Sequence, residues 1–210
     1  PLTAKWTAAF ALFGILVRVS PMLFIASPTV ADTEALMLPT RGNVYVSVEG
    51  MQVQVERQMT LLPGMMIQTG DGEVTFILND DGAARLAPYT TVTINDVSDR
   101  LEIASEILPS ITLHDGKLWM YGITPKPTRQ LAVKTRNGLI AINEGSVSIA
   151  VGDEVEVEVF DRSATIYRNG ELTFLTSGER MQLSNDKVLL VKKIPAKWYQ
   201  YTWADQNLKR

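Results

Sequence analysis

The sequence contains no cysteine and a single histidine, His114, which limits the chemistry open to it. Without thiols there is no disulfide, no thiol nucleophile and no Cys-based zinc or iron–sulfur site. One histidine without cysteine cannot build the common zinc sites, and we expect His114 to face solvent where a strand meets a turn. P-loop, dinucleotide-binding, EF-hand and nucleophile-elbow motifs are also absent. We therefore expect no enzyme, no catalytic residue, no metal and no cofactor.

The chain has an excess of positive charge only at its C-terminal end. The 210 residues carry a net charge of -3, and residues 187–210 hold six Lys or Arg and one Asp. Binding to nucleic acid needs a basic groove or face, which an acidic body with a basic tail does not supply. We predict no nucleic-acid partner. The length and the 46% hydrophobic content suit one globular domain with appendages.

A long amphipathic helical pattern is missing between residues 42 and 192, and short alternating runs occur there instead. In the stretch Leu61–Ile94, turn signals such as Thr69-Gly70 separate runs in which apolar and polar residues alternate. Turn signals at intervals of about 8–12 residues with period-2 runs between them are typical of an all-β unit. We predict an all-β, solenoid-like or β-roll stack of short antiparallel hairpins over residues 42–192.

Three runs of alternating apolar and polar residues predict specific strands. Val44–Val48 and Met51–Val55 flank the turn Glu49-Gly50, which predicts a hairpin with one buried and one wet face. The run Glu154–Phe160 predicts a strand whose valines face the core and whose three glutamates face water. We expect this glutamate row to protect a strand edge from pairing with other chains.

The first 26 residues contain an apolar run that is long enough to cross a bilayer. Lys5 precedes Trp6–Ala26, which is interrupted by Arg18 and by Pro21. A transmembrane helix and a secretory signal peptide cleaved before Asp32 are both open, and we favour the uncleaved helix. Arg18 would need a partner or would snorkel. Because Lys5 precedes the run and acidic residues follow it, the positive-inside rule places the N-terminus in the cytoplasm. Residues 27–41 are expected to be a linker.

The tail, residues 193–210, is basic and unusually aromatic. Pro195 can begin a short helix, on which Trp198, Tyr199, Tyr201 and Trp203 would form a broad aromatic surface. One interpretation is that the tail caps the β unit. The other is that it contacts a partner protein or returns to the bilayer interface, where Trp, Tyr and Lys are favoured. Together with Trp6 and Arg18, these aromatic residues are our candidate contacts to partner and membrane.

A series of short motifs runs in order through residues 42–183. The motifs are Gly42-Asn43-Val44, Leu61-x-x-Gly64-x-x-Ile67-x-Thr69-Gly70, Leu78-x-x-Asp81-Gly82, Pro88-x-Thr90-x-Val92-x-Ile94, Gly116-Lys117-Leu118-Trp119, Val133-x-Thr135-x-x-Gly138 and Leu175-x-x-Gly178-Glu179. This ordered set resembles the FecR domain of bacterial envelope proteins. The resemblance implies a repetitive, solenoid-like β fold on the non-cytoplasmic side of a membrane, and it carries over no catalytic residue.

The sequence departs from the FecR pattern in two ways. Gly145-Ser146-Val147-Ser148-Ile149 stands where the family has Gly-Thr before an aromatic-containing strand. The family's regulators also carry a cytoplasmic anti-sigma domain and a receptor-docking domain, whereas here at most five residues precede the apolar run.

These observations lead to three ordered hypotheses of function. The first is a non-enzymatic scaffold or accessory subunit of a larger bacterial inner-membrane complex, single-pass with its main domain in the periplasm. Its partners would be other subunits of that complex and membrane lipid. The alternative is a FecR-like envelope signalling or sensing module, and the third is a secreted glycan-binding module.

Overall fold

The computed structural model describes residues 35–78, 82–95, 110–123, 131–184 and 188–191. The chain divides into two units, Pro1–Ala31 and Asp32–Arg210, and all the described residues lie in the second. They form strands joined by turns and bends, without a helix. The expectation of an all-β unit is confirmed for these residues.

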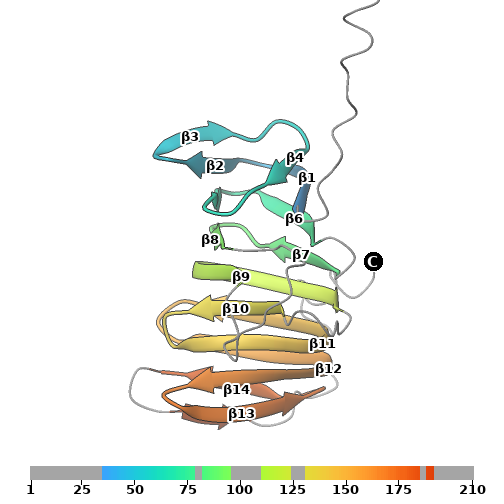
Figure 1. Ribbon diagram of the computed structural model, residues 1–210, viewed down its shortest axis with the longest axis vertical. Coiled ribbons are helices and arrows are strands. Elements are labelled where there is room, and N and C mark those ends of the chain that lie inside the picture. The colour runs from blue at the N-terminus through green and yellow to red at the C-terminus, as the bar shows by residue number, and fades with distance from the viewer. Residues whose placement is uncertain (1–34, 79–81, 96–109, 124–130, 185–187, 192–210) are drawn as a thin grey trace, which may run out of the picture. The chain divides into compact units, whose positions relative to one another are not determined.

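The strands of the described part follow one another closely along the chain. Their bounds are β1 Ala35–Arg41, β2 Val44–Val48, β3 Met51–Gln54, β4 Met59–Leu61, β5 Met66–Thr69, β6 Glu73–Leu78, β7 Ala83–Leu86, β8 Thr91–Ile94, β9 Ile111–Ile123, β10 Leu131–Thr135, β11 Gly138–Val151, β12 Val155–Arg168, β13 Glu171–Thr176, β14 Arg180–Leu183 and β15 Val188–Val191. They hydrogen-bond into one mixed sheet (Figure 1).

The strand pairs divide this sheet into two halves that share three long strands. Half-sheet A runs β3-β2-β5-β8-β9-β10-β11-β12-β13. Half-sheet B runs β4-β1-β6-β7-β9-β11-β12-β14-β15. The first part of β9 lies in half-sheet A and its second part in half-sheet B, and β11 and β12 are divided in the same way.

Bends at left-handed residues allow the long strands to serve both halves. β9 has Gly116 at φ 89°, β11 has Gly145 at φ 92°, and β12 has Arg162 at φ 62°. Glycine adopts this conformation without the steric cost that a Cβ brings. At Gly145 the space is also closed, because a Cβ would lie 2.3 Å from the carbonyl oxygen of Asp161.

One hydrophobic core lies between the two half-sheets. Its buried side chains alternate along the strands of both halves, as period-2 strands with one inner face require. Half-sheet A contributes residues such as Val46, Ile67 and Ile140, and half-sheet B contributes residues such as Phe76 and Ile149.

At one corner of the fold, hydrogen bonds of threonine hydroxyl groups join three successive coils of the chain. These coils are the end of β5, the connection between β7 and β8, and β9. The buried Thr69 hydroxyl donates to the carbonyl of Ala87 at 2.6 Å and accepts the amide of Thr90 at 2.8 Å. The Thr90 hydroxyl accepts the amide of Lys117 at 2.9 Å and donates to its carbonyl at 3.3 Å. Next to it, a Cβ on Gly116 would lie 2.4 Å from the Thr90 hydroxyl oxygen. The threonine and glycine motifs of the sequence therefore mark the contacts between coils.

The hairpin stack expected from the sequence is corrected in three respects. The strands are not all short, since β9 continues through Gly116 as one strand of 13 residues, because the glycine bends the strand without reversing it. The pairing is also not wholly antiparallel, since β10 runs parallel to β9. Finally, the expected linker, residues 27–41, contains β1, which pairs with β4 and β6.

Two expectations about individual faces are also corrected. The hairpin of β2 and β3 forms as expected and β2 buries Val44 and Val46 on one face, but every residue of β3 is exposed. The glutamates of β12 were expected to face water at a strand edge, but Glu158 is buried. β12 is not an edge either, since it lies between β11 on one side and β13 and β14 on the other.

Candidate functional site

The contact residues predicted from the sequence lie outside the described residues. This applies to Trp6, Arg18, Trp198, Tyr199, Tyr201 and Trp203. Their assignment to partner or membrane contacts stays a prediction. Within the described part of the chain, no helix is long and apolar enough to cross a bilayer. The same residues contain no group of His, Asp and Glu side chains that could hold a metal ion.

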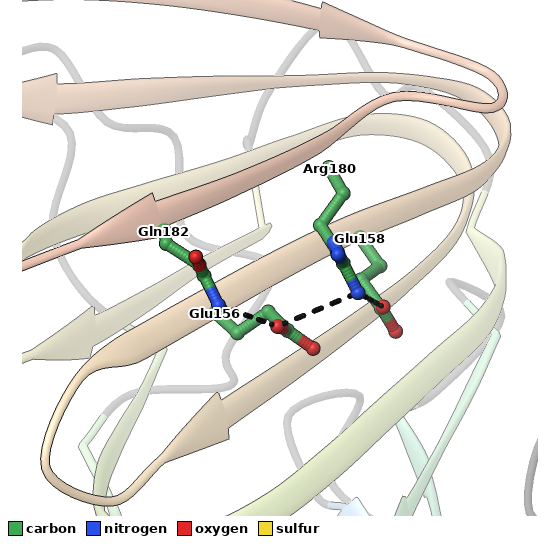
Figure 2. A network of polar contacts seen from close by, with 4 residues as sticks. All are labelled: Glu156, Glu158, Arg180 and Gln182. Atoms are coloured by element: carbon green, nitrogen blue, oxygen red, sulfur yellow. Dashed lines mark hydrogen bonds and ion pairs between the residues drawn. The ribbon is translucent and has the colours of Figure 1, made fainter. Parts of the chain in front are cut away.

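A charged network on the outer face of half-sheet B is the most distinctive polar feature of the described residues. β12 and β14 pair so that Glu156 lies opposite Gln182 and Glu158 opposite Arg180. Figure 2 shows the Arg180 guanidinium between the two carboxylates. Its Nη1 lies 3.8 Å from Oε2 of Glu156 and 3.7 Å from Oε1 of Glu158. Gln182 Nε2 donates to Oε2 of Glu156 at 3.2 Å.

The two carboxylates of this network differ in their exposure to solvent. The side chain of Glu158 is 3% exposed, whereas those of Glu156 and Arg180 are 28% and 32% exposed. Burial, helped by the negative charge of Glu156, raises the pKa of Glu158 to about 7. The positive charges of Lys117 and Arg180 act in the opposite direction and are weaker than the cost of burial. Glu158 therefore changes its charge close to neutral pH.

Two aromatic rings lie on the same face of half-sheet B. Trp119 on β9 and Phe160 on β12 are buried, with ring centroids 4.3 Å apart and planes tilted by 46°. Ser148 on β11 pairs with Trp119 on one side and Glu158 on the other, which makes a continuous row across the sheet. Ser148 is also buried, and the buried indole N–H of Trp119 has no hydrogen-bond partner among the residues that the structure describes. Polar groups are thus buried on a face where a two-layer β fold ordinarily meets water.

The contacts of this network link the charges of β12 to those of β14. Glu158 has Arg180 as its ion-pair partner on β14, with Glu156 sharing the same guanidinium. Its ion pairs and its side-chain hydrogen bond join carboxylate, guanidinium and amide groups. Such a network can fix β14 on β12 and respond to pH.

Sequence reasoning missed this network because alternation gives only the side of a strand. Alternation correctly placed Glu158 on the face of β12 that points away from the valines. It could not reveal that the side chain is buried on that outer face. A signal was present in Trp119, a large aromatic residue at an outer position of β9. His114 is exposed, as expected, but it lies within β9 rather than where a strand meets a turn, and its Nε2 lies 2.8 Å from the Thr93 hydroxyl.

Unburied apolar side chains gather at the two end strands of half-sheet A. On the hairpin of β2 and β3, Met51 is 70% and Val53 64% exposed. On β13, Leu172 is 66% and Phe174 59% exposed. In the described residues each of these strands pairs on one side only, β3 with β2 and β13 with β12. Both are therefore candidates for contact with other protein.

Comparison with solved structures finds a similar fold in two crystal structures. Two crystal structures of a protein from Parabacteroides distasonis ATCC 8503, described as a "putative anti-sigma factor", match with a TM-score of 0.50. The identity is 15% in one comparison and 14% in the other, and each alignment covers 63% of this chain. The matched region spans 61% of the length of those chains. No protein-family model and no curated protein matches the sequence. The likeness is one of fold, and at that level it is consistent with the FecR-like motifs.

Proposed function

We propose that this chain is a FecR-like signalling module of the bacterial envelope that works through contact with other proteins. The observation that carries the proposal is the shared fold with a protein described as an anti-sigma factor. The threonine and glycine motifs that resemble FecR also have a physical role here, since Thr69, Thr90 and Gly116 join successive coils. Fold and motifs therefore support the same family-level function.

In this proposal the β unit lies on the periplasmic side and senses a partner, without turning over a substrate. The apolar run Trp6–Ala26 would anchor the chain in the inner membrane, with the N-terminus in the cytoplasm. The signal would have to reach a regulator of transcription. Non-enzymatic action is favoured because the similar solved structures are described as anti-sigma factors.

A second function, as an accessory subunit of an inner-membrane complex, is favoured by one observation. Met51 and Val53 on β3 expose apolar surface on an end strand that pairs only with β2 among the described residues. Exposed apolar surface of this kind marks contact sites between proteins. A stable subunit interface would cover it permanently, whereas a sensor would cover it only in one state.

Deletion of the gene in its own bacterium separates the two functions. A signalling module predicts that a small, coherent set of transcripts changes while inner-membrane complexes keep their migration on native gels. An accessory subunit predicts the loss or shift of one complex, with transcripts outside that complex unchanged. Complementation with the intact chain must reverse the effect in either case. Unchanged transcripts together with a lost complex would overturn the signalling proposal.

A further inference from the structure

The free edge of β3 has features of a pairing surface. β3 is an end strand of half-sheet A and in the described residues pairs only with β2. Val48 and Met51 flank the two-residue turn Glu49-Gly50, whose φ values are 50° and 83°. In such a hairpin the flanking residues form a hydrogen-bonded pair and the pattern then alternates. The amides and carbonyls of Gln52 and Gln54 therefore point away from β2.

The side chains of β3 form one apolar and one polar row. Met51 and Val53 lie opposite Val48 and Val46, on the side of the hairpin that faces the core. Val46 is 3% exposed, whereas Val53 is 64% exposed, so the core side of the sheet is open to solvent at this strand. The polar row contains Gln52 and Gln54, which bond to Gln68 and Asn43. An added strand would continue the sheet and cover the exposed end of the core.

We propose that β3 binds β3 of a second copy of this chain, antiparallel and about a two-fold axis at Val53. In this register Gln52 lies opposite Gln54 of the other copy, so the outward backbone groups meet as hydrogen-bonded pairs. Val53 then lies opposite its own counterpart at a non-hydrogen-bonded position, where side chains approach most closely. Each copy covers the open core end of the other.

Charge on either side of β3 favours a second copy as the occupant. Glu49 lies four residues before Val53 and Arg57 four residues after it, and both are exposed. An axis at Val53 brings Glu49 of each copy toward Arg57 of the other, so two opposite-charge contacts arise from one symmetry. A two-fold interface requires this kind of self-complementary surface. The pairing is independent of the signalling proposal, since either proposed function is compatible with a dimer.

Single cysteines test the register directly, because the natural chain has no cysteine. In the full-length protein, Val53→Cys should give a covalent dimer under mild oxidation, since non-hydrogen-bonded partners have Cα atoms about 4.5 Å apart. Met51→Cys is the matched control, on the same strand and the same row, with 70% exposure. Two cysteines at position 51 would be separated by about 13 Å along the strands and could not be bridged.

The two cysteine variants give outcomes that decide the proposal. We expect Val53→Cys to form dimers at least about tenfold faster than Met51→Cys, since only the first pair has disulfide geometry. Equal rates would show random collision, and a Val53→Cys protein that stays monomeric would show that another segment or protein covers β3. Either result would overturn the proposal.

A charge exchange provides a second test that needs no cross-link. Arg57→Glu should weaken association in sedimentation velocity, because Glu49 then faces a like charge. Adding Glu49→Arg in the same chain should restore association, since the opposite charges meet again in the reversed order. Circular dichroism must show that each variant is folded. If the double variant associates no better than Arg57→Glu, the two-fold register is wrong.

Discussion

At the scale of single residues, the informative groups are polar side chains that the fold buries. Glu158 is held on the outer face of half-sheet B next to Arg180, and Thr90 is fully buried at the corner between coils. Burying a polar group is unfavourable unless its hydrogen bonds are replaced. The Thr90 hydroxyl replaces its hydrogen bonds to water with bonds to the backbone of Lys117. For Glu158, burial instead raises the pKa of the carboxyl group. The two residues therefore respond differently to substitution.

Glu158 should make the stability of the β unit depend on pH. The pKa of Glu158 in the folded state, about 7, lies above the ordinary value of 4.5, so the folded state binds the proton more tightly. The resulting stabilisation is present below the unfolded pKa and is lost as pH rises through about 7. We expect Glu158→Gln to gain stability relative to the natural protein between pH 5 and pH 8, by on the order of 1–3 kcal/mol.

Urea unfolding at several pH values would measure this change. Glu154→Gln removes a carboxylate of the same run at an exposed position and serves as the control. If the stability difference between Glu158→Gln and the natural protein is the same at pH 5 and pH 8, burial of a titrating Glu158 is refuted.

Thr90→Val should destabilise the fold although the side chain keeps its shape. The substitution removes the hydroxyl that bonds both backbone groups of Lys117 and leaves the amide without that acceptor. We expect a loss of about 1–3 kcal/mol in the free energy of unfolding. Thr91→Val, at the half-exposed neighbouring position, should change it by less than about 0.5 kcal/mol. Equal effects in the two variants would contradict the role given to the corner bonds.

At the scale of elements, a glycine can close a hairpin or bend a strand, and the two uses look alike in sequence. Asn169-Gly170 reverses the chain between β12 and β13, whereas Asp115-Gly116 bends β9 without ending it. Period-2 alternation predicted most of the strands correctly because it depends on local burial. It could not distinguish bends from turns, since the difference lies in which distant strand pairs next to the glycine. It also missed the burial of Glu158, because alternation indicates the side of a strand and not whether that side is exposed.

Alanine at these two glycines should separate the two uses. At Gly170, φ is 79° and nothing lies within 4 Å of the added Cβ, so we expect a cost of about 1–2 kcal/mol from the backbone alone. At Gly116, φ is 89° and the Cβ would lie 2.5 Å from the Cα of Thr90, so the cost should exceed about 3 kcal/mol. Guanidinium unfolding curves of the two variants would measure both values. A Gly116→Ala protein as stable as Gly170→Ala would show that the corner is not closely packed.

At the scale of the whole β unit, β9, β11 and β12 belong to both half-sheets, and one core lies between the halves. A substitution that destabilises one half-sheet should therefore destabilise the other as well.

The candidate partner contacts were not tested, since Arg18 and the aromatic tail lie outside the described residues and their roles stay predictions. The motifs indicated a FecR-like fold, but the sequence alone ranked a scaffold role above signalling, because a partner surface depends on side chains brought together by long-range pairing.

Ile149→Ala tests whether the half-sheets unfold together. Ile149 is fully buried on β11 within half-sheet B, and its truncation should cost about 2–5 kcal/mol. Hydrogen exchange should then show reduced protection in β10, which lies in half-sheet A, as well as in β14 of half-sheet B. Loss of protection in β14 with β10 unchanged would show that the halves are separate folding units.

The central claim is that this β unit signals by contact, and its most direct test is the transcript profile of strains carrying the glycine variants. If the account is right, the Gly116→Ala strain shows the same small set of altered transcripts as a deletion strain, while the Gly170→Ala strain matches the parent. If neither deletion nor Gly116→Ala alters a coherent set of transcripts, the signalling function is contradicted.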